Sequence, residues 1–151
     1  MREITQTALV AQPPARLFEL INDIENYPRF IPWVTRARVI SRTAAEIVAT
    51  LAVQRGPLSS EFTTRNELEP ERRILMHLVD GPFRMLEGEW LLTPIESSTV
   101  SAGGVGCRVQ LSMQFEFKNR VTAALFEQKF AETAASLVDA FVARARSTPR
   151  S

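Results

Sequence analysis

Apolar and polar residues alternate along most of the middle of this chain of 151 residues. The most regular run is 105–117, where apolar side chains from Val105 to Phe117 alternate with polar or small ones. A period of two sends successive side chains to opposite faces, so this run predicts a long strand with one buried face. Less regular versions of the same pattern predict further strands at 2–10, 46–54, 58–68, 73–80 and 83–93.

Two other segments repeat their apolar residues at steps of three and four, as amphipathic helices do. The first follows Pro13-Pro14, a pair that suits the first turn of a helix, and runs to Ile24. The second starts after Asn119, a suitable N-cap, and runs to about Arg146. At 1.5 Å per residue its length is on the order of 40 Å. Between the first helix and the strands, the prolines of 26–33 predict a loop without regular structure.

The order of these elements is strand, short helix, several strands and long helix, which predicts an α+β fold. Turns at Gly56-Pro57, at Asp80-Gly81 and in a flexible stretch at 97–104 join the strands. The sheet is therefore expected to be an antiparallel meander of six to seven strands. It should curve around the C-terminal helix, which buries its apolar stripe against the sheet. We expect one domain over 1–146 and a flexible tail at 147–151.

The inward face of the strand at 58–68 is more polar than a tightly packed core allows. Alternation places Ser60, Thr64 and Asn66 on the same face as apolar residues. Buried polar groups without hydrogen bonds cost free energy, whereas a few polar groups on apolar walls are typical of a ligand site. Gly88 in mid-strand and an alanine-rich final helix also leave volume unfilled. The alternatives are an inverted register, polar groups satisfied by backbone, and alanines present for helix propensity.

The predicted cavity lies between the sheet and the final helix. Its candidate lining residues are Ser60, Phe62, Thr64, Asn66, Leu86, Trp90, Phe115, Phe126, Phe130 and Leu137. Side chains of the 26–33 loop are candidates for a lid or entrance, and for contact with a membrane surface. These are Tyr27, Phe30, Ile31 and Trp33. They could equally plug the end of the core, an interpretation that suits Phe30 and Trp33.

Charge and composition narrow the range of partners. The net charge of +1 gives no general attraction to DNA. Arginine accounts for 16 of the 18 basic residues, and arginine pairs with phosphate better than lysine does. Four arginines near one another are candidate RNA contacts, or else belong to a solvated face: Arg29, Arg36, Arg38 and Arg42.

The sequence carries no membrane span and no export signal. No window approaches the ~18 continuous apolar residues of a transmembrane helix. The N-terminal segment lacks the apolar core of a signal peptide. The expected location is the cytoplasm, with peripheral contact at the inner face of the membrane as an option.

Groups for covalent, acid–base or metal chemistry are scarce. His77 is the sole histidine and Cys107 the sole cysteine, so the usual zinc-ligand sets are excluded. Within an alternating strand, Cys107 is expected to be a buried, inert thiol. The glycines at 103–106 lack the strand and helix context of a phosphate-binding loop. The sequence therefore favours a non-enzymatic protein that requires no cofactor.

Several blocks of the chain, in order and at similar spacing, resemble a known family. They are ITQTALV at 4–10, NYPRFIPW at 26–33, FTTRNEL at 62–68, LVDGPFRMLEGEW at 78–90 and FEF at 115–117. Over nearly its whole length the chain resembles the coenzyme Q-binding START-domain proteins of the START-like (polyketide cyclase, SRPBCC) superfamily. Within that superfamily it is most similar to the bacterial ribosome-association toxin (RatA) branch.

This resemblance implies a helix-grip fold with a hydrophobic tunnel between the sheet and the C-terminal helix. The implied ligand is ubiquinone or another polyprenyl lipid. The resemblance also implies that the protein binds this ligand without converting it, and that binding supports respiration. The ribosome-association branch implies a different activity, which is binding to the large ribosomal subunit and blocking subunit association. Some START-like relatives are cyclases or hydrolases, so a cyclase or thioesterase-like activity is a third alternative. A shared fold does not by itself decide among them.

Overall fold

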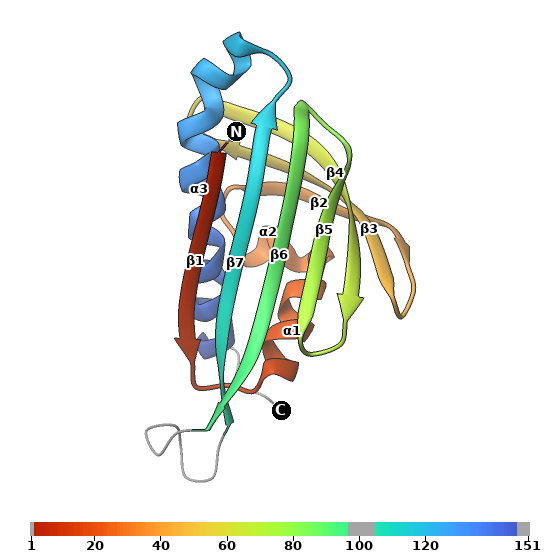
Figure 1. The fold of residues 1–151 in the computed structure, drawn as a ribbon, viewed down its shortest axis with the longest axis vertical. Helices are drawn as coiled ribbons and strands as arrows, with labels where there is room; N and C mark the ends of the chain where they lie inside the picture. The colour runs from red at the N-terminus through yellow and green to blue at the C-terminus, as the bar shows by residue number, and fades with distance from the viewer. Residues whose placement is uncertain (1, 97–104, 148–151) are drawn as a thin grey trace.

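Seven strands form one antiparallel sheet that curves around a long C-terminal helix (Figure 1). The structure, a computed structural model, describes residues 2–96 and 105–147. In chain order the elements are β1 (Arg2–Val10), α1 (Pro14–Asn22), the 3-10 turn η1 (Ile24–Asn26), α2 (Tyr27–Phe30), β2 (Val34–Arg42), β3 (Glu46–Arg55), β4 (Leu58–Glu69), β5 (Arg73–Asp80), β6 (Phe83–Glu96), β7 (Val105–Phe117) and α3 (Arg120–Ser147).

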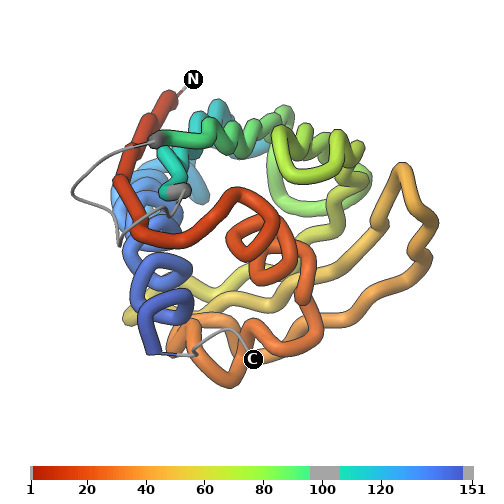
Figure 2. Tube along the Cα trace, turned by 90° about the horizontal axis from the view of Figure 1, so that it is seen from below, coloured from red at the N-terminus to blue at the C-terminus, as the bar shows by residue number. Residues whose placement is uncertain are grey.

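The strands lie in the order β1-β7-β6-β5-β4-β3-β2, so the first two strands of the chain form the two edges. Each strand from β2 to β6 pairs with the next strand in the chain, and β1 pairs with β7 at one edge of the sheet. Seen end-on, the sheet bends into an arc with α1 and α3 on its inner side (Figure 2). The predicted α+β helix-grip architecture is thus confirmed.

The sheet was predicted to have six to seven strands, but only six were assigned to residue ranges, and β2 was not among them. Its outward side chains are mostly exposed and polar, and two β-bulges break its pairing with β3. A bulge inserts a residue and interrupts the alternation on which the prediction rested. The prediction of an irregular loop at 26–33 was also wrong, because Tyr27–Phe30 forms the single helical turn α2. Pro28 is tolerated there because the first turn of a helix needs no backbone N–H from it.

The long helix α3 begins where the sequence predicts. The Asn119 side-chain oxygen accepts a hydrogen bond from the Thr122 backbone N–H at 2.7 Å, as an N-cap does. The helix continues through Ser147, which was expected to belong to the tail. The remaining residues of that tail, 148–151, and the loop expected at 97–104 lie outside the described residues. None of the described helices combines the length and apolar character needed to cross a membrane.

An aromatic cluster joins α3 to the sheet at one end of the core. Phe83 stacks on Phe117 with ring centroids 4.8 Å apart, and Phe130 of α3 lies 4.7 Å from Phe115. Such contacts stabilise beyond the area that they bury. Farther along α3, buried side chains continue the apolar stripe at Ala134, Val138, Phe141 and Ala145. The stripe fixes which face of α3 lies on the sheet.

We expect Asn119→Ala to destabilise the protein by about 1 kcal/mol, because the first turn of α3 loses its cap. Asn119→Ser retains a capping oxygen and is expected to stay close to the wild type. Urea unfolding of the three proteins measures the difference. Equal midpoints for Asn119→Ala and Asn119→Ser would contradict the assigned cap.

Candidate functional site

A cavity lies between the inner face of the sheet and α3. The space that the centre of a water molecule can occupy inside it is about 70 Å³. Strands β3 to β7 supply one wall, α3 supplies the other, and η1, α2 and Trp33 close one end. Nine residues of the predicted cavity and lid line it: Tyr27, Trp33, Phe62, Thr64, Asn66, Leu86, Trp90, Phe130 and Leu137.

Three predicted cavity residues lie elsewhere. Phe115 is fully buried in the aromatic cluster, with its ring against Phe83 and Phe130. Phe126 packs half-buried against the core one turn before Phe130, beyond the end of the cavity. Ser60 shares the inward face of β4, but its hydroxyl is buried away from the cavity and has no hydrogen-bond partner in the described segments 2–96 and 105–147. A side chain on the inner face of the sheet therefore does not necessarily line the cavity.

The four predicted lid residues divide into two pairs. Tyr27 and Trp33 line the cavity, whereas Ile31 is fully buried in the core. Phe30 packs edge-on against Tyr27 and Phe141, at centroid distances of 6.0 and 5.6 Å. The Arg144 guanidinium lies 4.9 Å above its ring. Phe30 and Ile31 thus act as a plug, and only Tyr27 and Trp33 border the hollow.

Asn66 is the main polar group of the cavity wall. It is buried, and the Thr64 hydroxyl donates to its Oδ1 at 2.9 Å. That is the one hydrogen bond of the Asn66 side chain within the described residues, so the two amide N–H groups remain available. The other hydroxyls bond to backbone: Thr133 donates to the Lys129 carbonyl at 2.7 Å.

The Tyr27 hydroxyl also bonds to backbone, since it donates to the Ile21 carbonyl. Burial raises its pKa well above the usual value, with a smaller effect from Asp23. The phenol therefore stays neutral and cannot act as a charged partner for a ligand. Among the polar side chains of the wall, Asn66 has the most unused hydrogen-bonding capacity.

Gly88 makes room for Met76 and Met113, two cavity residues that were not predicted from the sequence. A β-carbon at Gly88 would lie 2.4 Å from the Met76 methyl and 3.7 Å from the Met113 methyl. Gly88 pairs with Met76 on one side and Met113 on the other, so the three form a row across the sheet. Methionine has three rotatable bonds, so this wall can change shape at low cost.

The other cavity residues that the sequence did not identify are apolar or small. They are Ile24, Ala49, Leu51, Val53, Thr133, Ala134 and Phe141. The alternation of β3 places three of them on the inner face and could have found them.

The size of the cavity limits what fits without movement. A water molecule needs about 10–15 Å³ of this kind of volume, so the cavity has room for only a few waters. Sites for drug-sized ligands span about 300–1,000 Å³. A ligand with a long chain must therefore displace part of the wall, and the methionine row is its most adaptable part.

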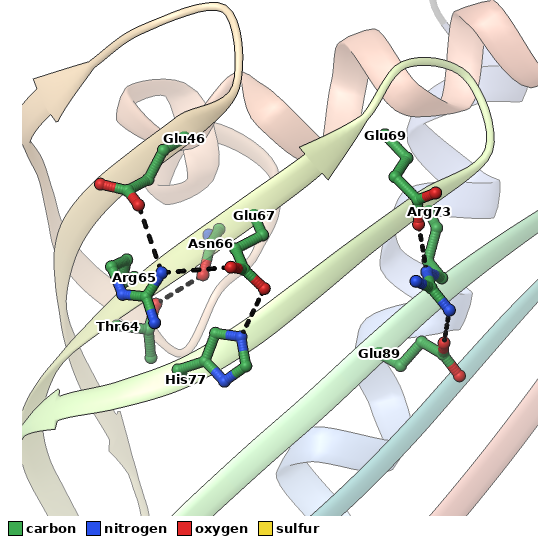
Figure 3. Close-up of polar contacts among 9 residues, drawn as sticks. All are labelled: Glu46, Thr64, Arg65, Asn66, Glu67, Glu69, Arg73, His77 and Glu89. Atoms are coloured by element: carbon green, nitrogen blue, oxygen red, sulfur yellow. Dashed lines mark hydrogen bonds and ion pairs between the residues drawn. The ribbon is translucent and has the colours of Figure 1, made fainter.

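A network of ion pairs covers part of the outer face of the sheet. His77 on β5 contacts Glu67 on β4 at 2.9 Å, and Arg65 bridges Glu67 and Glu46 at 3.3 and 3.2 Å (Figure 3). The hydrogen bond with His77 lowers the pKa of the Glu67 carboxyl. Next to this network, Arg73 contacts Glu69 and Glu89. These groups stabilise the solvent face and do not reach the cavity.

His77 and Cys107 do not meet. Cys107 is buried on the inner face of β7, opposite Pro94 and Val10, whereas His77 points outward. Burial raises the pKa of the Cys107 thiol to about 11, so it is protonated at neutral pH. Within the described residues no group of three or more potential metal ligands forms a site.

The four candidate RNA contacts do not share one surface. Arg36 and Arg38 project from the outer face of β2, where Arg36 pairs with Glu61 at 3.1 Å. The bulge between Val39 and Ser41 reverses the alternation, so Arg42 faces inward. Arg42 donates to the Asn22 carbonyl at 3.2 Å. Arg29 is exposed on α2.

Comparison with known proteins supports the predicted relationship. The ribosome association toxin RatA of Escherichia coli (strain K12) is 38% identical over 146 residues, which are 97% of this chain and 88% of that protein. The coenzyme Q-binding protein COQ10 of Drosophila melanogaster is 29% identical over 119 residues, which are 78% of this chain and 48% of that protein.

A START superfamily protein from Mycobacterium smegmatis has the same fold. Its TM-score is 0.77 at 20% identity, and the match covers 96% of this chain and 97% of that one. The sequence pattern of the family described as polyketide cyclase / dehydrase and lipid transport matches residues 10–142. This match spans most of the chain and includes the strands and helices that enclose the cavity. The chain therefore belongs to the polyketide cyclase / dehydrase and lipid transport family.

Proposed function

We propose that this protein binds a hydrophobic ligand carrying one polar head group, and that it does so without chemical conversion. The observation that carries the proposal is the cavity under α3, whose apolar wall contains the partly unpaired Asn66 amide. Apolar walls favour burial of a hydrocarbon chain by roughly 25 cal/mol per Å². The amide N–H groups can donate to a carbonyl oxygen on the ligand.

Ubiquinone or another polyprenyl lipid has this combination of an apolar chain and carbonyl oxygens. The similarity to a coenzyme Q-binding protein supports this choice. A quinone ring at Asn66 would require the side chains of Met76 and Met113 to move, because the closed cavity holds only a few waters. The proposed role is storage or delivery of the ligand in support of respiration.

Association with the ribosome is the second candidate function. It is favoured by similarity to ribosome association toxins, which is higher in identity and extends over more of the chain than the similarity to the coenzyme Q-binding protein. The exposed Arg36 and Arg38 on the β2 edge are the proposed contacts to RNA of the large subunit. A surface on β2 and a cavity under α3 are separate, so both functions can coexist in one molecule.

Ala134→Leu is expected to weaken ligand binding by roughly five- to 150-fold, because overpacking a filled site costs about 1–3 kcal/mol. Ala134 lines the cavity from α3. The matched control is Ala124→Leu, the same change on the exposed side of the same helix. Trp33 and Trp90 are the only tryptophans and both line the cavity, so quenching of their fluorescence by a short-chain ubiquinone analogue measures binding. Equal quenching in both variants and the wild type would place the ligand elsewhere.

Asn66→Leu is expected to reduce affinity for the quinone analogue by about two- to tenfold, the value of one hydrogen bond. Affinity for an alkyl chain of matched length without the ring is expected to stay unchanged. Calorimetric titration of both compounds into wild type and variant separates the two effects. A similar loss for both compounds would mean that Asn66 shapes the cavity and does not anchor the head group.

The ribosome function predicts that added protein lowers the fraction of assembled ribosomes and sediments with the large subunit at low salt. Replacing Arg36 and Arg38 together by glutamine should weaken this binding and reduce its salt dependence. A double variant with Arg72→Gln and Arg120→Gln has the same net charge and serves as control. Sucrose gradients at two salt concentrations give the readout. Unchanged gradients with wild-type protein would exclude this function.

A further inference from the structure

A second hollow adjoins the cavity on the far side of Trp33. It is an open groove of about 470 Å³ between the end of β3 and the outer flank of α3. Its lining residues are Pro32, Trp33, Gln54, Arg55, Ser136 and Ala140. Trp33 lines both hollows, so its side chain is the partition between the cavity and the groove.

Arg55 is an unpaired cation in this groove. Its Nη1 is buried and has no hydrogen-bond partner among the residues that the structure describes. The Ser60 hydroxyl is also buried, and it likewise has no hydrogen-bond partner among those residues. Arg55 pairs with Leu58 across the β3–β4 hairpin, so Ser60 is its diagonal neighbour on the same face, within reach of a long side chain. A buried guanidinium N–H without an acceptor costs free energy, which an oxygen of a ligand at Arg55 would recover.

Nearby carboxylates are already paired with other cations. Lys129 of α3 lies close to this hairpin, since its Cε is 3.8 Å from the position of a β-carbon at Gly56. Lys129 pairs with Glu132 at 3.6 Å, and Glu61 pairs with Arg36 on the opposite face of the sheet. Among residues 2–96 and 105–147, no carboxylate therefore neutralises the charge of Arg55.

We propose that the groove binds the oxyanion end, a carboxylate or a phosphate, of an amphiphile whose chain passes Trp33 into the cavity. This inference rests on the proposed function, because the chain must occupy the cavity under α3. A guanidinium binds either oxyanion through short, charge-assisted hydrogen bonds. Single-chain lipid acids would thus bind with the head group at Arg55, whereas the neutral quinone ring proposed above binds at Asn66.

Trp33 is well placed to open the passage. Its carbonyl accepts a hydrogen bond from the Gln54 backbone N–H at 2.8 Å, which ties the main chain of Trp33 to β3. The indole is only half-buried, so its side chain can rotate while the backbone stays in place. Rotation would join the groove to the cavity beside Leu137 and Val53.

The test compares lauric acid, dodecyl phosphate and methyl laurate, which share a chain but differ in head group. Calorimetric titrations are made below their critical micelle concentrations and at a pH where the acids are ionised. Wild-type protein should bind at least one acid roughly tenfold more tightly than the neutral ester, as a charge-assisted hydrogen bond allows. The tighter of the two acids identifies the head group.

Arg55→Met retains the apolar stem and removes the charge, so it should bind acid and ester equally, with ester affinity unchanged. Arg72→Met is the matched control, because exposed Arg72 lies at the other end of β4 and should keep the preference. Thermal unfolding of Arg55→Met checks its fold, and loss of an unpaired buried cation is not expected to destabilise it.

Each result decides one of the two proposals. Equal binding of acids and ester by wild type, or an acid preference that survives in Arg55→Met, would overturn the oxyanion site while leaving the cavity proposal intact. Failure of all three compounds to bind would also overturn the oxyanion site, and the titration with the quinone analogue would then decide the cavity proposal. Loss of ester binding in a folded Arg55→Met protein would also contradict the oxyanion site, because the neutral head group makes no use of the charge.

Discussion

The packing of α3 on the inner face of the curved sheet is the contact on which the rest of the structure depends. The aromatic cluster around Phe83 and Phe130 closes one end of this contact, and Phe141 with Tyr27 closes the other. Between these two ends, the small side chain of Ala134 leaves part of the space between sheet and helix unfilled. Because protein interiors otherwise pack to high density, the remaining hollow is a specific feature of this arrangement.

The wall of that hollow combines a fixed part with an adaptable part. Asn66 is held by Thr64 on a central strand, so its free donors have a defined position. Met76 and Met113 form the adaptable part of the wall, because their flexible side chains fill the space left by Gly88. A fixed donor can select a head group, while a deformable wall can accept chains of differing length. This division suits the ligand binding that we propose for the cavity.

Charge is distributed unevenly over the molecule. On the outer face of β3, β4, β5 and β6, arginines and carboxylates pair with one another, and His77 belongs to that network. Exposed ion pairs of this kind contribute little to stability but keep the face soluble and well ordered. Arg55 differs because it lies on the inner face and has no acidic partner within the described part of the chain. This cation adjoins the apolar cavity on the far side of Trp33, which gives that end of the cavity a positive charge.

The sequence alone determined the features that depend on local periodicity. Residues close together in the chain set the alternation in β7 and the three- and four-residue spacing of apolar residues in α3 after its Asn119 cap. They also set the inward direction of Thr64 and Asn66. Tertiary structure decided what depends on distant pairs. The bulges of β2 turned Arg42 inward, the placement of α3 excluded Phe115 and Phe126 from the cavity, and the pairing of β5, β6 and β7 aligned the methionines with Gly88. Periodicity tells which face a side chain takes, but only the register and depth of packing determine what that face meets.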